Sequence, residues 1–185
     1  QARGLISAAA PEVQASGAAV FKLDIELDNE TGKSKKVMVV NTLLDASGKA
    51  VGSSSSVVRL SAGASRKVVS QSMTLKNPQL WSVERPYIYK VRTQVKVGGK
   101  VVDEYYTNTG VRSFRFDAEK GFFLNGKNMK INGVCQHHDM GCLGAAVNED
   151  ALYRQLKMLR DMGANAGRCS HNPPAPELLN MCDTM

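Results

Sequence analysis

The spacing of apolar residues changes near Gly110, and this change limits the fold of the chain more than any other feature. Before Gly110, apolar residues alternate with charged or polar ones at 20–28 and 87–97, a pattern typical of half-buried antiparallel strands. Turn signals such as Gly98-Gly99 separate these strands from others that we expect at 37–44, 56–60, 67–75 and 101–107. About seven short strands in roughly 100 residues predict an immunoglobulin-like β-sandwich.

After Gly110 the pattern becomes strand, helix, strand, helix. A strand is expected at 129–135, followed by a helix at 148–162 that Asn148 caps and Gly163 ends. A second strand at 164–168 precedes a helix opened by Pro173-Pro174. This order is how a parallel α/β unit begins.

The length of the second half allows only part of such a fold. From Phe114 onward 72 residues remain, whereas a (β/α)8 barrel takes roughly 250. We therefore predict a mainly β chain with two domains: a sandwich over 1–113, and over 114–185 an incomplete (β/α)8 barrel holding its first two βα units. The first residue is Gln1 and no signal peptide is recognisable, so we expect a piece of something longer.

Charge and hydropathy exclude two classes of partner. The formal net charge is +7, but its Lys and Arg residues are scattered singly along the strands, without the basic stripe of a nucleic-acid-binding protein. No apolar run approaches the roughly 20 residues that cross a bilayer, so we expect no membrane span. Asn29-Glu30-Thr31 fits the N-glycosylation pattern, which often arises by chance.

Residues suited to chemistry gather in the second half, where all four cysteines and all three histidines lie after position 134. His137, His138 and Asp139 follow the first expected strand, and Arg168 and His171 end the second. Because active sites of α/β barrels form at the C-terminal ends of the strands, two such clusters on consecutive strands indicate a functional site.

Three other interpretations of these clusters stay open. Cysteine, histidine and aspartate could bind a metal, but their spacing matches no common zinc pattern. Cys135 or Cys169 beside a histidine could act as a nucleophile, although a strand cysteine is more often a buried, inert thiol. For His138 a structural hydrogen bond is favoured slightly over contact with substrate.

The motifs of the chain, taken in order, resemble family 2 of the glycoside hydrolases, the β-galactosidase- and β-glucuronidase-like enzymes. The resemblance covers essentially the whole chain. The motifs that carry it lie between residues 80 and 183: Leu80-Trp81-Ser82, Pro86-Tyr87-Ile88-Tyr89, Gly110-Val111-Arg112, Gly121-Phe122-Phe123-Leu124-Asn125-Gly126-Lys127, Asn132-Gly133-Val134, His137-His138-Asp139, Gly163-Ala164-Asn165-Ala166, Arg168-Cys169-Ser170-His171-Asn172-Pro173 and Cys182-Asp183. It implies a sandwich followed by a catalytic (β/α)8 barrel. Many members have Asn where this chain has Cys135, which leaves the sugar specificity open.

The resemblance also implies roles for four residues. His137 and His171 would bind sugar hydroxyls, Arg168 would orient a carboxylate nucleophile, and Asp139 would support the loop 140–146. The family hydrolyses β-linked glycosides with retention through two glutamates on later strands, which lie outside these residues. Glu149 and Glu177, at or within helices, are no substitutes, so this segment alone is expected to be inactive.

The remaining expectations concern partners. The partner implied is a carbohydrate substrate, with no cofactor and no metal. Exposed helix faces (Leu152, Leu156, Leu159, Leu178 and Leu179) predict either self-association through the open barrel edge or poor order after about residue 140. The alternative function is a non-catalytic carbohydrate-binding or scaffold module, for which Trp81, expected to be a packing residue, offers no aromatic platform. The resemblance points to a bacterial enzyme, periplasmic or secreted, while the cysteines leave the compartment open.

Overall fold

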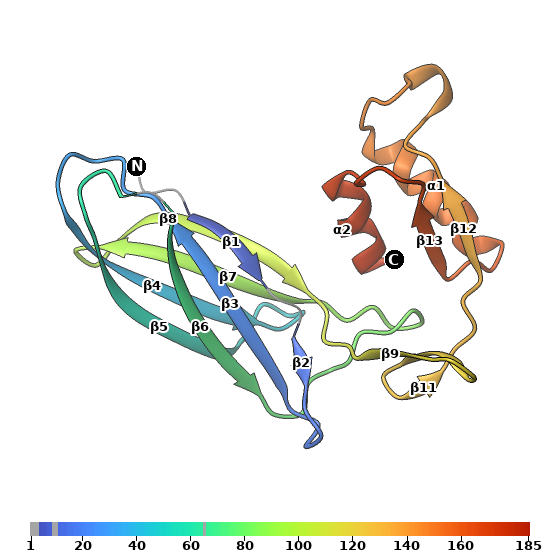
Figure 1. The fold of residues 1–185 in the computed structure, drawn as a ribbon, viewed down its shortest axis with the longest axis horizontal. Helices are drawn as coiled ribbons and strands as arrows, with labels where there is room; N and C mark the ends of the chain where they lie inside the picture. The colour runs from blue at the N-terminus through green and yellow to red at the C-terminus, as the bar shows by residue number, and fades with distance from the viewer. Residues whose placement is uncertain (1–3, 9–10, 65) are drawn as a thin grey trace. The chain divides into compact units, whose positions relative to one another are not determined.

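Two antiparallel sheets form the larger of two units in the computed structural model, which describes residues 4–8, 11–64 and 66–185. This unit spans 1–81 and 87–112, and the second unit spans 82–86 and 113–185. In the first sheet β3 pairs with β6 on one side and with β1 and β2 on the other; the second sheet has the order β5-β4-β7-β8 (Figure 1). The bounds are β1 Gly4–Ala8, β2 Glu12–Val13, β3 Ala19–Leu27, β4 Lys35–Leu44, β5 Ala50–Leu60, β6 Lys67–Leu75, β7 Tyr89–Val97 and β8 Lys100–Thr109.

The core of the sandwich lies between the two sheets and follows the predicted alternation. Every second residue of β3 is buried, and β4 and β7 alternate in the same way. The sealed centre is made of the apolar residues Phe21, Leu23, Ile25, Leu27, Val37, Val39, Leu43, Leu60, Val91 and Val111. The prediction of a sandwich is therefore confirmed, with β1 and β2 as strands that the sequence pattern did not indicate.

A polar network crosses this apolar core. The Asn41 amide donates a hydrogen bond to Gln71 Oε1 in the opposite sheet (2.9 Å), and the Thr93 hydroxyl donates to Asn41 Oδ1. Gln71 Nε2 donates to Ser56 Oγ (2.7 Å), and the Ser54 hydroxyl donates to Gln71 Oε1 (2.5 Å). Because unpaired polar groups are costly in a core, these bonds fix how the two sheets face each other.

Two turns of the sandwich show how local sequence sets the chain path. Gly98 and Gly99 join β7 to β8 with φ angles of +56° and +81°, as a two-residue hairpin with positive φ at both positions requires. Asn29, in the sequence that fits a glycosylation pattern, is buried, and its Nδ2 donates to the carbonyls of Lys33 (3.0 Å) and Ser61 (2.6 Å). Its amide is therefore a structural bridge.

The second unit contains a small antiparallel sheet, a parallel strand pair and two helices. The small sheet has the order β11-β10-β9, and β12 pairs in parallel with β13. The bounds are β9 Phe114–Asp117, β10 Gly121–Leu124, β11 Lys127–Asn128, β12 Gly133–Gln136, η1 Gly141–Leu143, α1 Glu149–Asp161, β13 Ala166–Cys169 and α2 Pro176–Thr184. The predicted order strand, helix, strand, helix is confirmed.

Several predicted bounds in this unit were wrong, for physical reasons. Both parallel strands begin later than expected because Asn165 bonds outside the ladder: its side chain accepts from Asn132 N (2.8 Å) and donates to Lys130 O (2.9 Å). α2 begins at Pro176, three residues after Pro173. Each proline disfavours helical geometry in the residue before it, and Ala175 is extended at φ −61°, ψ 140°.

The helix faces are only partly as expected. The Asn148 side chain caps α1 by accepting from Ala151 N (2.9 Å), and Gly163 follows the helix with φ +93°. Leu152 and Leu178 are buried, so the prediction that they form exposed faces was wrong, whereas Leu179 is exposed. Among the described residues no helix has the length and apolar character needed to cross a bilayer.

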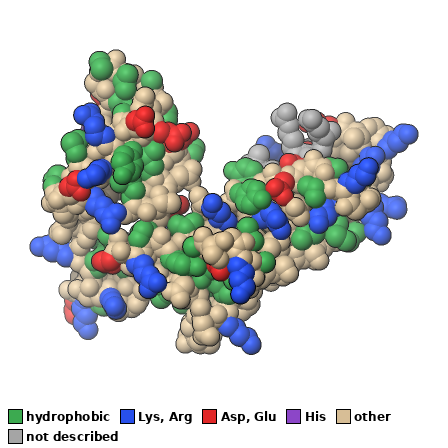
Figure 2. Space-filling view, turned by 180° about the vertical axis from the view of Figure 1, so that it is seen from behind, with side chains coloured by type: hydrophobic (Ala, Val, Ile, Leu, Met, Phe, Trp, Pro, Cys, Tyr) green, Lys and Arg blue, Asp and Glu red, His purple; other side chains and the backbone are tan. Residues whose placement is uncertain are grey.

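The basic residues are spread out on the face of the molecule seen in Figure 2, where Lys and Arg side chains are interspersed with apolar and other polar ones. Lys90, Arg92 and Lys96 alternate along β7 with the buried side chains Val91 and Val95. The positive charge thus lies on the solvent side of a half-buried strand.

Candidate functional site

The parallel pair β12–β13 positions the candidate residues. Its ladder pairs Gly133 with Ala166 and continues to Gln136 opposite Cys169. Ser170 N then donates to Gln136 O (2.9 Å), which extends the pairing beyond the last strand residues. The two chain segments therefore leave the C-terminal edge of the ladder together, and the residues that follow them share one edge.

His137 and His171 meet at this edge. Each histidine follows its strand within two residues, and their ring centroids lie 6.2 Å apart with the rings nearly perpendicular, at 83°. Both side chains are exposed. His171 has φ +69°, an unusual value for a residue with a Cβ, and its N–H donates to Cys169 O (2.9 Å). The sharp bend after β13 thus directs the His171 ring toward His137.

Arg168 lies on the same face of the ladder as His137. It pairs with Cys135 in the parallel register, and Arg168 Nη1 is 3.9 Å from Cys135 Sγ, within hydrogen-bond range for sulfur. His137 lies two positions after Cys135 along the chain, and side chains two positions apart on an extended strand share a face. Arg168 is exposed and presents its remaining guanidinium donors to solvent on that face.

Asp139 serves the loop after β12. Its carboxylate accepts from Gly141 N (3.0 Å), at the start of η1. His138 Nε2 lies 3.1 Å from Ala145 O, so the two residues hold both ends of the loop 139–146. The structure thus brings His137, His171 and Arg168 to one face and places Asp139 in the adjoining loop.

A shallow depression lies at the C-terminal edge of the strand pair, where Leu152 of α1 and Leu178 of α2 face it. Gln136 Nε2 donates to Gln155 Oε1 in α1 (2.9 Å) beside it. Arg168 and His171 lie outside its lining, which consists of Gln136, His137, His138, Asp139, Met140, Leu152, Gln155, Cys169, Ser170, Asn172, Pro174 and Leu178. Sequence reasoning missed Gln136, Gln155 and Ser170. Period-2 alternation from Cys135 could have placed Gln136 on the helix side.

The cysteines form no disulfide, and the described His and Cys side chains form no metal-binding cluster. All four cysteines, which lie in the described part of the chain, are free thiols. Within residues 4–8, 11–64 and 66–185, no group of three or more His, Cys, Asp and Glu side chains is placed to hold a metal ion. What the geometry offers is a set of hydrogen-bond donors and acceptors at a strand edge, suited to a neutral or anionic polar ligand.

Comparison with known proteins places this geometry in one family. The sequence model of Glycosyl hydrolases family 2 matches residues 8–112, and the model of the family 2 TIM barrel domain matches residues 117–185. A β-galactosidase of Bacteroides ovatus is 49% identical over 167 residues, which cover 90% of this chain and 20% of that protein.

Solved structures agree with this assignment. A glycosyl hydrolase family 2 member from Bacteroides cellulosilyticus DSM 14838 superposes with a TM-score of 0.86 and 34% identity, covering 98% of this chain and 24% of that one. A Bacteroides uniformis β-glucuronidase superposes with a TM-score of 0.87 and 30% identity, over 97% and 21% of the two chains. The chain thus spans about a fifth to a quarter of these relatives. Since the family models follow both its sandwich and its βαβα segment, the chain belongs to family 2 of the glycosyl hydrolases.

Proposed function

We propose that this chain is a segment of a retaining glycoside hydrolase that acts on β-linked glycosides and is β-galactosidase-like. Its sandwich would occupy 1–113 and its barrel portion 114–185. The Bacteroides ovatus β-galactosidase, which shares 49% identity over 90% of this chain, supports a β-galactoside as the substrate. β-Glucuronidases among the relatives make β-glucuronides the substrate to test against it.

One observation carries the proposal: two imidazole rings from neighbouring parallel strands meet at the C-terminal edge, 6.2 Å apart. At that edge they can each hydrogen-bond a hydroxyl of one sugar ring, as donor or acceptor according to tautomer. Arg168 on the same face supplies a fixed positive charge, which can orient a carboxylate and keep it ionised. Asp139 holds the loop that borders this face.

Retaining hydrolysis needs two carboxyl groups about 5–5.5 Å apart, and the resemblance to the family assigns both glutamates to later strands, outside this segment. Glu149 and Glu177 lie in the first turns of α1 and α2. A carboxylate near a helix N-terminus is stabilised there by the helix dipole, so both have a structural reason for their position. We therefore propose that this chain contributes sugar contacts but does not cleave glycosides alone.

The test compares this chain with the whole protein that contains it, on aryl β-galactoside and aryl β-glucuronide substrates. We expect no turnover by the chain and turnover by the whole protein, with the galactoside preferred. His137→Ala and His171→Ala should each lower kcat/KM of the whole protein roughly ten- to a hundredfold, the loss of one or two sugar hydrogen bonds. Asn180→Ala, at an exposed position of α2, is the control.

Two results would overturn the proposal. Turnover by the 185-residue chain that disappears in His171→Ala would show that the segment is catalytic. Saturable sugar binding by the whole protein without any hydrolysis would instead favour a non-catalytic carbohydrate-binding module. A preference for the glucuronide would keep the hydrolase and replace only its sugar.

A further inference from the structure

The small β11-β10-β9 sheet carries a preformed aromatic face. Phe114 and Phe116 of β9 alternate onto the same side as Phe122 and Leu124 of β10, which they oppose in the register. The Phe116 and Phe122 ring centroids lie 5.1 Å apart, and Phe114 lies 6.3 Å from Phe116. Phe114 and Phe116 are nonetheless 65% and 72% exposed. An exposed cluster of touching phenylalanines of this kind marks an interaction surface.

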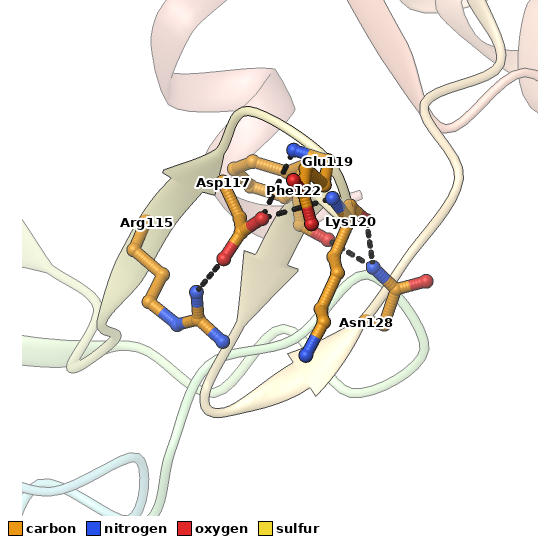
Figure 3. A network of polar contacts seen from close by, with 6 residues as sticks. All are labelled: Arg115, Asp117, Glu119, Lys120, Phe122 and Asn128. Atoms are coloured by element: carbon orange, nitrogen blue, oxygen red, sulfur yellow. Dashed lines mark hydrogen bonds and ion pairs between the residues drawn. The ribbon is translucent and has the colours of Figure 1, made fainter.

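On the opposite side of the same sheet the Arg115 guanidinium lies over the Phe123 ring, 3.6 Å from its centroid, and polar contacts hold the turn and β11 (Figure 3). The Asp117 carboxylate accepts from the backbone N–H groups of Glu119 (3.1 Å) and Lys120 (2.9 Å) and pairs with Arg115 Nη1 (3.2 Å). Asn128 Nδ2 donates to Lys120 O (2.6 Å), which fastens β11 to the turn. The aromatic face is therefore held on a rigid support, so little conformational entropy would be lost when a partner covers it.

The chain fixes where this sheet can lie. Met129 N donates to Phe122 O (2.9 Å), and Lys130 O accepts from Asn165 Nδ2 (2.9 Å), directly before β13. The sheet is thus held at the N-terminal ends of β12 and β13. His137 and His171 follow the C-terminal ends of the same strands. Ile131, between the sheet and β12, adds another exposed apolar side chain at the N-terminal end.

We infer that the face formed by Phe114, Phe116 and Phe122 closes the N-terminal end of the complete (β/α)8 barrel, packing on the first residues of the barrel strands that the whole protein contributes beyond this segment. The interior of such a barrel is filled by layers of apolar side chains, and its N-terminal end serves stability while chemistry sits at the other. The aromatic face, which only a short segment separates from β12, is placed to cover that end. The inference rests on the barrel fold and not on hydrolysis.

The experiment measures the accessibility of position 116 in two proteins. Phe116→Cys and, as a matched control in the turn of the same sheet, Glu119→Cys are made in this chain and in the whole protein. Alkylation by iodoacetamide at each position is followed by peptide mass spectrometry, which separates it from the native cysteines. We expect similar rates at both positions in this chain, and in the whole protein an at least tenfold slower rate at position 116 alone.

Equal reactivity of position 116 in the two proteins would overturn the inference. Protection within this chain that grows with protein concentration would also overturn it, because a second copy would then be covering the face. Hydroxyl-radical oxidation of Phe114 and Phe116 in the unmodified proteins gives the same comparison without a substitution that could disturb folding. Aryl glycoside turnover is recorded on the same samples. Protection of position 116 in a whole protein that turns over neither glycoside would refute the proposed function and leave this inference standing.

Discussion

The sandwich buries its own core, whereas the barrel segment fully buries few of its large apolar side chains. In the sandwich, alternating residues of both sheets are buried, and a polar network joins the sheets through Asn41 and Gln71. In the second unit the buried apolar residues among those described are Leu124, Leu152 and Leu178, while Met158, Met162 and Leu179 are exposed. An antiparallel sandwich is complete with about 100 residues, but a parallel barrel is covered only once its strands and helices close on each other.

The largest expected effect tests whether the sandwich is the stable unit. Phe21 is 1% exposed and its ring meets Tyr89 edge to face at 6.2 Å. Phe21→Ala should destabilise the sandwich by about 3–5 kcal/mol through lost burial and a cavity. Phe116→Ala in this chain should change its stability by less than about 0.5 kcal/mol, as at other exposed positions. Denaturant unfolding followed by fluorescence of Trp81, the single tryptophan, measures both, and equal losses would refute the comparison.

A second prediction concerns close packing at the edge of the sandwich. A Cβ on Gly110 would lie 3.0 Å from Cβ, Cγ and Cδ1 of Trp81, whose backbone N–H donates to Val111 O (2.8 Å). Gly110→Ala should therefore destabilise the sandwich by about 1–3 kcal/mol through overpacking. Gly52→Ala is the control, because its nearest neighbour would be an ordinary 3.7 Å away. A stability unchanged in Gly110→Ala would show that Trp81 can move aside freely.

The same contrast explains how much of the fold the sequence predicts. In β3 and β7 one face is buried and the other faces solvent, so apolar and polar residues alternate clearly. Both strands therefore begin and end within two residues of their expected bounds. β9, β10 and β11 escaped prediction because they are two to four residues long, too short for a period to appear. α2 was misplaced because Pro176, and not Pro173, is the last proline of the run.

The candidate site was predictable only where a motif marks it. Their place after two expected strands singled out His137, Arg168 and His171, and the resemblance implied their roles. The structure adds their common edge. The hydrogen bond between Gln136 and Gln155 joins residues 19 apart, on a strand and a helix. Glutamine has no characteristic spacing, so only the packing of α1 on the strand pair brings these two amides together.

A smaller effect is expected in the barrel segment, where α1 depends on its cap. The Asn148 side chain accepts from Ala151 N at 2.9 Å, and Glu149 and Asp150 follow in the first turn. Asn148→Ala should destabilise the helix by about 1 kcal/mol, while Asn148→Asp should keep the cap. Hydrogen exchange of the α1 amides in this chain measures both. Unchanged exchange in Asn148→Ala would mean that packing, and not the cap, sets the helix start.

The smallest effect tests how the support of the aromatic face responds to acid. Hydrogen bonds from Lys120 N–H and Glu119 N–H, with a contribution from Arg115, hold the pKa of Asp117 below its usual value. A lowered pKa in the folded chain stabilises the turn above the unfolded value of about 3.9, and this stabilisation is lost as the pH falls through the folded pKa. The Lys120 and Glu119 amide resonances should therefore titrate with a midpoint below the ordinary aspartate pKa, and Asp117→Asn should abolish the titration. A midpoint at or above the ordinary aspartate pKa would show that these N–H groups do not hydrogen-bond the Asp117 carboxylate. The polar contacts on the other side of the sheet would then give the aromatic face no rigid support.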